Sequence, residues 1–508
     1  MQPDRPLPLR DLSLRDALIA TCAQLLPRCG DTTADGVQQV IARLEAPLQV
    51  VVAGRISSGK STLVNALIGR RVAPTAVGEC THLVTRFSYG TVDRVEVVLR
   101  NDHRLPLPFD ADGMIPADVA SQAGVPLQDV SHLEAYLTSS LLSALTVIDT
   151  PGLGSLDAES AGRTTGLLDD TSRSAVVGAE AVLYVLTQSV RADDADALAA
   201  FAAATAGRDA GPVNTLALLN KADTVAPESV AGSGGNVWQA ARLLAERQAQ
   251  LLGPRVADVL PVVGLLGETC ESGSFEAADA DALRAIATVD EDSRIAMLLA
   301  ADLFLSVECS VDVVVRQRLL ERLDLYGITC ALRALDAEPT MPVGRLRAAL
   351  LGASGVVQVR SRLVEVFSTR ADGIKAAAAL GSLTALAQSS GDPEEQQLVR
   401  GGIEELLALP QAHQLRMMEA LTLLTGGSVE LDGELVAEVV RLGTGADARA
   451  QLATPDATPA QLSATALERA GWWRSFASFG ASAAQERVAH VVHRAYFLLW
   501  QELQGTHP

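Results

Sequence analysis

The chain has 508 residues, 48% apolar and 20% charged, which is the composition of a globular protein of about three domains. Its 61 acidic side chains outnumber its 41 lysines and arginines, giving a formal charge of −20. This charge argues against nucleic acid as a partner and against strong attraction to anionic lipid, because both need a basic surface. The six cysteines lack metal-ligand spacing, and no stretch has the apolar length of a signal peptide core or a membrane span. We therefore expect a cytoplasmic protein.

Two amphipathic helices are predicted first, over residues 12–26 and 36–44. A valine-rich strand over 48–53 runs into residues 54–61, Gly-Arg-Ile-Ser-Ser-Gly-Lys-Ser, which match the phosphate-binding pattern G-x-x-x-x-G-K-[ST]. Helical spacing over 62–68 places the backbone N–H groups of this loop at a helix N-terminus, where the helix dipole favours a phosphate. The sequence therefore predicts a nucleotide-phosphate site on the loop.

The phosphate-binding loop supplies most of the expected nucleotide contacts. Lys60 is expected to reach the β- and γ-phosphates, and the Ser61 hydroxyl is expected to ligate Mg²⁺. Lys60 is one of only three lysines in the chain, and the others are Lys221 and Lys375. The loop residues expected to contact the nucleotide are Gly54, Arg55, Ser57, Ser58, Gly59, Lys60, Ser61 and Thr62.

A second strand is predicted over 145–148 and ends in Asp-Thr-Pro-Gly. At its end Asp149 would hold Mg²⁺ through a water molecule, and the Gly152 N–H would contact the γ-phosphate. Such residues alone often form a plain turn. At a strand end about 90 residues after a phosphate-binding loop, they indicate the magnesium side of a nucleotide site.

The strand predicted over 214–219 ends in Asn-Lys-Ala-Asp, the guanine-specificity pattern. The Asp223 carboxylate can accept hydrogen bonds from N1 and N2 of guanine, which adenine does not offer. Asn220 is expected to contact N7 and to tether the phosphate-binding loop, and the aliphatic part of Lys221 is expected to cover the base. The sequence thus predicts GTP or GDP as the ligand.

Two further positions carry weaker signals. Thr81 lies 21 residues after Lys60, and its hydroxyl would complete Mg²⁺ coordination when the γ-phosphate is present, with Thr75 as the alternative. A strand predicted over 259–263 leads to Gly264, whose N–H would contact guanine O6. Any glycine after a strand would look the same.

These motifs resemble the dynamin superfamily, specifically its bacterial dynamin-like GTPases. The similarity rests on GRISSGKSTLVNAL, PTAVGECT, DTPGL and NKAD, and on LYGITCALRAL further along, where the chain resembles the smaller member of the mycobacterial isoniazid-inducible pair. It implies an α/β P-loop GTPase domain, with a mixed, mostly parallel sheet flanked by helices, and an extended α-helical neck and trunk bundle. The implied division is neck helices over 1–45, a GTPase domain over 46–285, and a trunk with a returning neck helix over 286–508.

The resemblance also implies a route for hydrolysis, which is needed because no glutamine follows Gly152 to orient the attacking water. Members of the superfamily use a serine at the position of Ser57, helped by a monovalent cation at the phosphate-binding loop and by a partner GTPase domain. The implied catalytic residues are Ser57, Lys60 and Thr81.

Three charged residues have both a catalytic and a structural interpretation. Arg55 would neutralise charge in the transition state, or it faces solvent. Asp193 and Asp194 follow a strand predicted over 181–186 and would reach across a GTPase-domain dimer, or they cap a helix.

The resemblance implies a Mg²⁺-dependent GTPase that is stimulated by dimerisation or by a paired dynamin-like protein. It would maintain or remodel membrane, with peripheral contact at the inner face of the plasma membrane. The alternative is a non-assembling GTPase switch, or a regulatory subunit whose helical trunk binds a protein partner. The aromatic cluster at 472–479 fits either core packing between the last helices or insertion among lipid headgroups.

Overall fold

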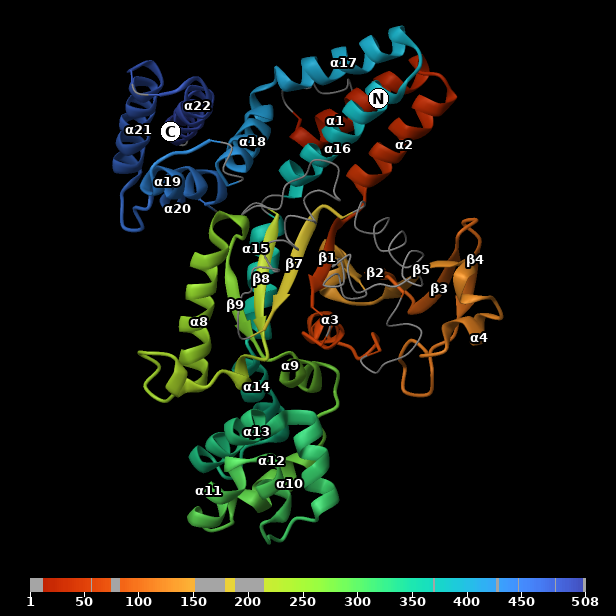
Figure 1. Ribbon diagram of the computed structural model, residues 1–508, viewed down its shortest axis with the longest axis vertical. Helices are drawn as coiled ribbons and strands as arrows, with labels where there is room; N and C mark the ends of the chain where they lie inside the picture. The colour runs from red at the N-terminus through yellow and green to blue at the C-terminus, as the bar shows by residue number, and fades with distance from the viewer. Residues whose placement is uncertain are drawn as a thin grey trace, which may run out of the picture.

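The computed structural model describes residues 12–55, 57–74, 83–150, 179–187, 214–368, 371–425, 429–445, 447–479 and 481–505. A sheet occupies the middle of an elongated molecule, and helices gather at both ends of its strands (Figure 1). In the described part of the chain this sheet has nine strands in the order β4-β3-β5-β2-β6-β1-β7-β8-β9. The strands are β1 Leu48–Gly54, β2 Thr85–Tyr89, β3 Arg94–Leu99, β4 Arg104–Leu107, β5 Val130–Leu137, β6 Leu145–Asp149, β7 Ala181–Leu186, β8 Thr215–Asn220 and β9 Val259–Val262.

The central strands are continuous apolar runs buried on both faces, as parallel strands covered by helices are. β1 pairs in parallel with β6 and β7, and β8 and β9 continue in parallel, whereas β2 is antiparallel to β6. Alternate residues of β1 face opposite cores, one shared with α3 (Lys60–Ile68) and α15 (Val356–Ser368) and the other with α8 (Val237–Leu252). This arrangement confirms the predicted fold class. The helices around the sheet are α3 Lys60–Ile68, α4 Val119–Ala123, α5 Ser140–Ala144, α8 Val237–Leu252 and α15 Val356–Ser368.

One group of helices lies at the amino ends of β1 and β7 (Figure 1). The two N-terminal helices, predicted from sequence, pack there against an alanine-rich helix and the helix that follows it. The last helix packs chiefly against the one before it. The N-terminal helices are α1 Leu14–Leu25 and α2 Asp31–Glu45, the alanine-rich helix is α16 Ala371–Ser389, and the helix that follows it is α17 Pro393–Leu407. The remaining helices of this group are α18 His413–Thr425, α19 Gly433–Thr444, α20 Ala448–Leu452, α21 Pro459–Phe479 and α22 Ala483–Gly505.

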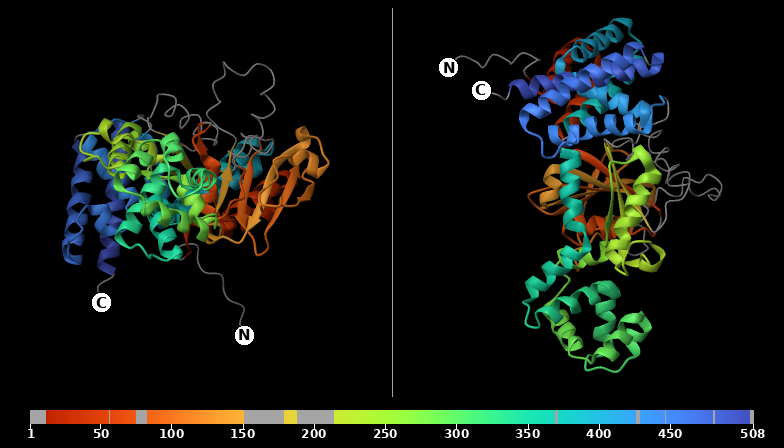
Figure 2. Two further views of the ribbon diagram at one scale, coloured as in Figure 1. Left: turned by 90° about the horizontal axis from the view of Figure 1, so that it is seen from below. Right: turned by 90° about the vertical axis from the view of Figure 1, so that its left-hand side faces the viewer.

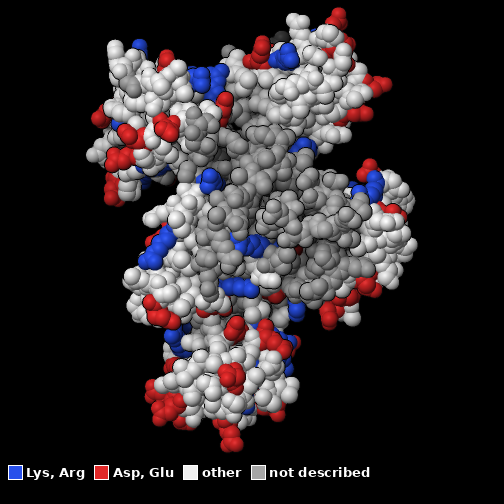
Figure 3. Space-filling view, in the orientation of Figure 1, with Lys and Arg blue, Asp and Glu red and all other residues white. Residues whose placement is uncertain are grey.

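A second group of helices lies at the opposite, carboxyl ends of the strands (Figure 2). The chain passes through this group after β9 and then returns along the sheet as α15, so the helices after residue 286 are divided between the two ends of the sheet. Acidic side chains gather at its far tip (Figure 3). Its helices are α9 Gly264–Glu271, α10 Ala277–Ala287, α11 Glu291–Leu299, α12 Ala301–Ser306, α13 Val313–Ala337 and α14 Val343–Ser354.

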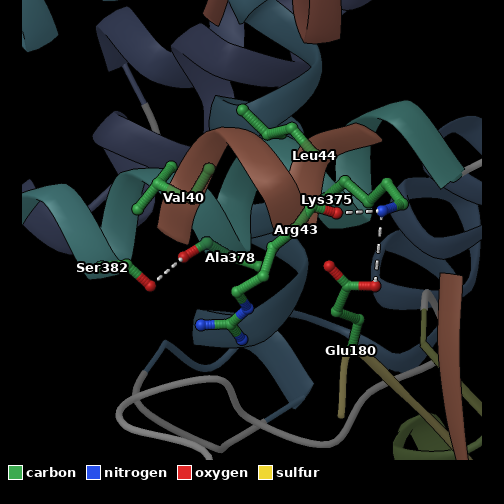
Figure 4. Close-up of a pocket in the computed structure, with 8 residues that line it drawn as sticks. Val40, Arg43, Leu44, Glu180, Lys375, Ala378 and Ser382 are labelled. Atoms are coloured by element: carbon green, nitrogen blue, oxygen red, sulfur yellow. Dashed lines mark hydrogen bonds and ion pairs between the residues drawn. The ribbon is translucent and has the colours of Figure 1, made fainter. Parts of the chain in front are cut away.

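A buried ion pair joins the first group of helices to the sheet (Figure 4). Lys375 of α16 is 3% exposed, and its Nζ lies 3.8 Å from a carboxylate oxygen of Glu180, next to β7. The same ammonium donates a hydrogen bond to the carbonyl of Arg43 in α2, at 2.5 Å. Glu180 in turn accepts a hydrogen bond from the Gln49 N–H of β1, at 3.0 Å. The third lysine of the sequence is therefore a structural contact between helices and sheet.

None of the described helices has both the length and the apolar character that a membrane span requires.

Candidate nucleotide-binding site

The phosphate-binding loop connects β1 to α3 at the carboxyl edge of the sheet. Gly59 caps α3 with a φ of 82°, a left-handed conformation that glycine adopts without strain. A Cβ at this position would lie 2.5 Å from the Asn220 side-chain nitrogen, so only glycine fits. Ser57 also has a positive φ, 63°, in this tight loop. The N-terminus of α3 thus lies directly behind the loop, as anion binding requires.

Lys60 points back into the loop. Its ammonium donates hydrogen bonds to the carbonyls of Gly54, at 3.1 Å, and Arg55, at 3.0 Å. Burial lowers the pKa of Lys60, and the nearby Asp149 carboxylate opposes that effect. A buried ammonium whose hydrogen bonds in the described part of the chain go to neutral carbonyls is well suited to an anionic ligand.

Two oxygen donors meet beside the loop. The Ser61 hydroxyl donates to Asp149 Oδ2 at 2.8 Å, across β1 and β6. The other carboxylate oxygen, Asp149 Oδ1, is buried and has no hydrogen-bond partner in the described part of the chain. Burial raises the pKa of Asp149 to about 6, and the Ser61 hydrogen bond and the Lys60 charge oppose that shift. A carboxylate and a hydroxyl side by side form a donor pair suited to a hard cation such as Mg²⁺.

The Asn220 side chain connects the two halves of the site. It is 2% exposed, and its Nδ2 donates to the Ser58 carbonyl of the phosphate-binding loop at 2.7 Å. Its Oδ1 accepts a hydrogen bond from the Gly264 N–H, the first residue of α9, at 3.0 Å. One amide therefore fixes the phosphate-binding loop, the end of β8 and the start of α9 relative to each other.

Asp223 lies in a short 3₁₀ turn, Ala222–Thr224, directly after β8. It is half-buried, and burial raises the pKa of its carboxyl, with the charge of Asp324 adding to the effect. Lys221, just before it, is exposed and has a left-handed φ of 57°.

The structure brings the motif residues that it describes to one edge of the sheet, at the carboxyl ends of β1, β6, β8 and β9, where parallel sheets hold their ligands. Thr62 lies in the first turn of α3. The predicted residues that fall outside the described ranges are Thr75, Thr81, Gly152, Asp193 and Asp194.

Sequence reasoning missed one group that supports the site. Asn65 in α3 is fully buried, and its Oδ1 accepts hydrogen bonds from the N–H groups of Val72 and Ala73. Its Nδ2 donates to the Ala73 carbonyl at 2.8 Å and to Glu268 of α9 at 2.7 Å. Asn65 thus anchors the chain shortly before Thr75. The signal was a polar residue in the apolar face of a helix, where it needs buried partners.

Comparison with known proteins agrees with this geometry. A model of the Dynamin family matches residues 50–222. Isoniazid-induced protein IniC of Mycobacterium tuberculosis is 30% identical over 444 residues, which are 86% of this chain and 86% of that protein. The chain belongs to the dynamin family. The matched range includes the phosphate-binding loop, Asp149 and Asn220, so these residues belong to a dynamin-family GTPase domain.

Other relatives of this dynamin-family chain match shorter stretches. Isoniazid-induced protein IniA of Mycobacterium tuberculosis is 31% identical over 136 residues, 26% of this chain and 21% of that protein. A bacterial dynamin-like protein of Nostoc punctiforme is 28% identical over 152 residues, 28% of this chain and 20% of that protein. A solved structure described as "An oligomerised bacterial dynamin pair provides a mechanism for the long range sensing and tethering of membranes" is 11% identical, with a TM-score of 0.34, and covers 99% of this chain and 92% of its own.

Proposed function

We propose that this dynamin-family chain binds GTP and GDP with Mg²⁺ and hydrolyses GTP. The observation that carries the proposal is the Asn220 amide, which joins the phosphate-binding loop to Gly264 beside the Asp223 turn. This connection favours a ligand with both a phosphate chain and a base. The proposed nucleotide contacts are Gly54, Arg55, Ser57, Ser58, Gly59, Lys60, Ser61, Thr62, Asp149, Gly152, Asn220, Lys221, Asp223 and Gly264.

The donors beside the loop fit Mg²⁺. Ser61 would ligate the ion directly and Asp149 through water, and Thr81 would join them when GTP is bound. The unpartnered Asp149 Oδ1 supports this assignment, because a buried carboxylate oxygen without a partner is costly unless a ligand or water fills the place. Bound Mg²⁺ would neutralise charge on the β- and γ-phosphates.

The chain's own residues would act on the phosphates as follows. Lys60 exchanges the carbonyls of Gly54 and Arg55 for phosphate oxygens, so its hydrogen bonds are retained while its charge is neutralised. Ser57 is the proposed group that orients the attacking water, with a monovalent cation beside it. The tight loop holds Ser57 at its positive φ, which supports a fixed position for that side chain.

Base specificity tests the proposal directly. Asp223→Asn replaces one acceptor by a donor, so it should lose GDP and gain the xanthine nucleotide, whose position 2 carries an oxygen where guanine has the amino group. We expect the ratio of GDP to XDP affinity, measured by titration calorimetry, to fall at least 100-fold in Asp223→Asn. Equal binding of GDP and ADP by the unmodified chain would refute the proposed function.

We further propose that turnover depends on assembly, with a second copy or a paired dynamin-like protein, and that the assembly acts at a membrane surface. One part of the aromatic cluster at 472–479 is packed in the core, and another part is exposed and supports this membrane role. Trp473 is fully buried and donates to Glu438 at 3.0 Å, which is core packing. Trp472 is 39% exposed and stacks on Phe476, and Phe479 at the end of α21 is 93% exposed. Trp472 and Phe479 are therefore the members of the cluster that an interface could contact.

GTP turnover measured against protein concentration, with and without liposomes, tests the assembly proposal. We expect the rate of GTP turnover per chain to rise with protein concentration. Lys60→Ala should abolish GTP turnover at every concentration. Phe479→Ser, at an exposed site, should remove any stimulation by liposomes while leaving the concentration dependence. A flat rate that liposomes do not change would favour a non-assembling GTPase switch or a regulatory subunit. The division at residues 46 and 286 stays a prediction.

A further inference from the structure

Two helices carry the loops of the nucleotide site at their N-terminal ends. α3 begins at Lys60, directly after the phosphate-binding loop, and α9 begins at Gly264, which the Asn220 amide joins to that loop. The two helices pack on each other so closely that a Cβ on Gly267 of α9 would lie 3.3 Å from Ala66 Cβ of α3. The relative position of α3 and α9 therefore sets the spacing between the loops that we propose bind the phosphates and the base.

The opposite, C-terminal ends of the two helices meet at one side chain, that of Arg360 in α15. Its Nη2 donates to the Ala66 carbonyl at 2.6 Å and its Nε to the Leu67 carbonyl at 3.0 Å, both in the last turn of α3. Its Nη1 donates to Oε1 of Glu271, the last residue of α9, at 2.5 Å. A guanidinium can hold three acceptors in fixed directions because its N–H groups form a rigid, planar fork. Arg360 therefore joins the ends of α3 and α9 from a third helix.

The charges at this junction favour a connection between the two helix ends over two unrelated contacts. A helix C-terminus carries a partial negative charge, so a glutamate as the last residue of α9 is unfavourable by itself and needs a cation nearby. Arg360 supplies that cation, and it also supplies donors to two α3 carbonyls that have no partner within their own helix. Arg360 is 26% exposed and Glu271 is 21% exposed, so water screens the ion pair only in part.

A second polar contact between α3 and α9 lies between the nucleotide loops and Arg360. Asn65 Nδ2 donates to Glu268 Oε1 at 2.7 Å, and both side chains are buried. One such contact fixes the separation of two helices at that point, whereas a second contact further along also fixes the angle between them. From Asn65 to Lys60 the helix is about 7.5 Å long, so a tilt of ~8° about Asn65 would move Lys60 by about 1 Å. Binding sites need their groups held within about 0.5 Å.

We propose that Arg360 is a positioning residue for the nucleotide site. It fixes the angle between α3 and α9, and thereby aligns the phosphate-binding loop with Gly264 before the ligand arrives. Arg360 does not touch the ligand, because it lies at the other ends of both helices. Its effect is on ligands that occupy both loops at once, since only these ligands require the loops to be in register. The inference rests on the proposed binding of a guanine nucleotide across the two loops.

The test compares Arg360→Gln with Arg362→Gln, both in the full chain. Arg362 is the matched control because it lies on the same helix, is 32% exposed, and pairs with Asp258 and Glu365, which are outside α3 and α9. We expect Arg360→Gln to bind GDP about tenfold more weakly in titration calorimetry, because GDP must then select the aligned arrangement from a wider ensemble. Arg362→Gln should bind GDP within about twofold of the unmodified chain, as expected for a surface ion pair.

Two fragments of the ligand separate positioning from a general loss of folded structure. Guanosine would occupy only the base loops and pyrophosphate only the phosphate-binding loop, so neither requires the loops to be aligned. We expect the affinities of guanosine and pyrophosphate, measured by calorimetry at millimolar concentrations, to change by less than about twofold in Arg360→Gln. A partly unfolded variant would instead bind GDP, guanosine and pyrophosphate more weakly by one common factor.

Arg360→Lys provides a second variant, which keeps the positive charge at the helix ends but not the rigid fork that spans three acceptors. It should weaken GDP binding as Arg360→Gln does, and recovery of GDP affinity by lysine would overturn the inference, because charge alone would then suffice. Unchanged GDP affinity in Arg360→Gln, or equal losses for GDP and both fragments, would also overturn it. Either result would leave the proposed function intact if the unmodified chain still prefers GDP to ADP. Equal binding of GDP and ADP by the unmodified chain would instead refute the proposed function itself.

Discussion

The Asn220→Ala substitution gives a quantitative test of the connection between the two halves of the site. It removes the donor to the Ser58 carbonyl and the acceptor of the Gly264 N–H, from a side chain that is 2% exposed. A buried polar group that loses its partner costs about 1–3 kcal/mol. With two groups affected, we expect the free energy of unfolding of the nucleotide-free chain to fall by about 2–3 kcal/mol.

Nucleotide affinity should fall as well, because the phosphate-binding loop and Gly264 are no longer held in register before the ligand arrives. GDP must then restore, on binding, the geometry that both contacts hold in the unmodified chain. A binding cost of about 2–3 kcal/mol corresponds to a loss in GDP affinity of roughly 30- to 150-fold. Titration calorimetry with GDP measures this loss, and urea unfolding followed by tryptophan fluorescence measures the change in stability. Asn220→Asp should be at least as damaging, since it keeps the acceptor for Gly264 but places a carboxylate oxygen against the Ser58 carbonyl.

The matched control is Asn236→Ala, in the same part of the chain. Asn236 caps α8 by accepting a hydrogen bond from the Gln239 N–H at 2.9 Å. Its loss should cost about 1 kcal/mol of stability, as helix caps do, without changing GDP affinity. The reasoning is refuted if Asn220→Ala binds GDP as tightly as Asn236→Ala does.

Three further predictions concern the helices and the junction. Glu438→Ala should lower the free energy of unfolding by about 3–5 kcal/mol in urea melts followed by tryptophan fluorescence, because Trp473 and other buried donors lose their shared carboxylate; a loss under about 1 kcal/mol would contradict this. Burial and nearby arginines lower the pKa of His413 to about 4, so the native state binds fewer protons than the unfolded state as the solution becomes acidic. About 1.5 kcal/mol of stability should therefore be lost as pH falls from about 6.5 to 4, after allowing for partial exposure, and His413→Gln should flatten this pH dependence in melts across the same range. Lys375→Met should destabilise the chain by about 3 kcal/mol, because it removes the cation that neutralises buried Glu180, and adding Glu180→Gln should restore most of the melting temperature; no restoration would show that packing, not charge, holds the junction.

The sequence predicted the parts of the fold that depend on local patterns. Apolar runs ending in glycine, aspartate or asparagine located β1, β6 and β8, and their order along the chain located one edge of the sheet. Those motifs are short, and their chemistry constrains each position, so spacing alone carries the information. The same reasoning identified the aromatic cluster but not which of its members are buried and which are exposed. The burial of Trp473 depends on Glu438, which lies 35 residues away in the chain.

The positions of the helices were not predictable in the same way. Helical periodicity shows which face is apolar but not which partner covers it, and the N-terminal helices could have packed on any apolar face. In the last helix Val488, Val492, Tyr496 and Leu499 are buried, whereas Val491 and Leu498 are half-buried. Helix α13 has a non-helical residue at Asp324, with a φ of 52°, and this interruption could not be predicted because the residues beside it are held by other helices, α9, α10 and α14 among them.

The two groups of helices differ in how they connect to the nucleotide site, and this difference has a consequence for function. The group at the carboxyl ends contacts the loops that we propose bind the base, through Gly264 and Val263. The group at the amino ends contacts the sheet at the other end of its strands, through the Lys375 and Glu180 pair. A change in the bound base can therefore reach the group at the carboxyl ends through these hydrogen bonds, whereas the group at the amino ends lies at the far end of the strands and is reached through β1, β7 and α15. Hydrogen exchange in GDP should accordingly protect α9 and α13 first, and protection of α2 and α16 should require a ligand that also repositions the strands.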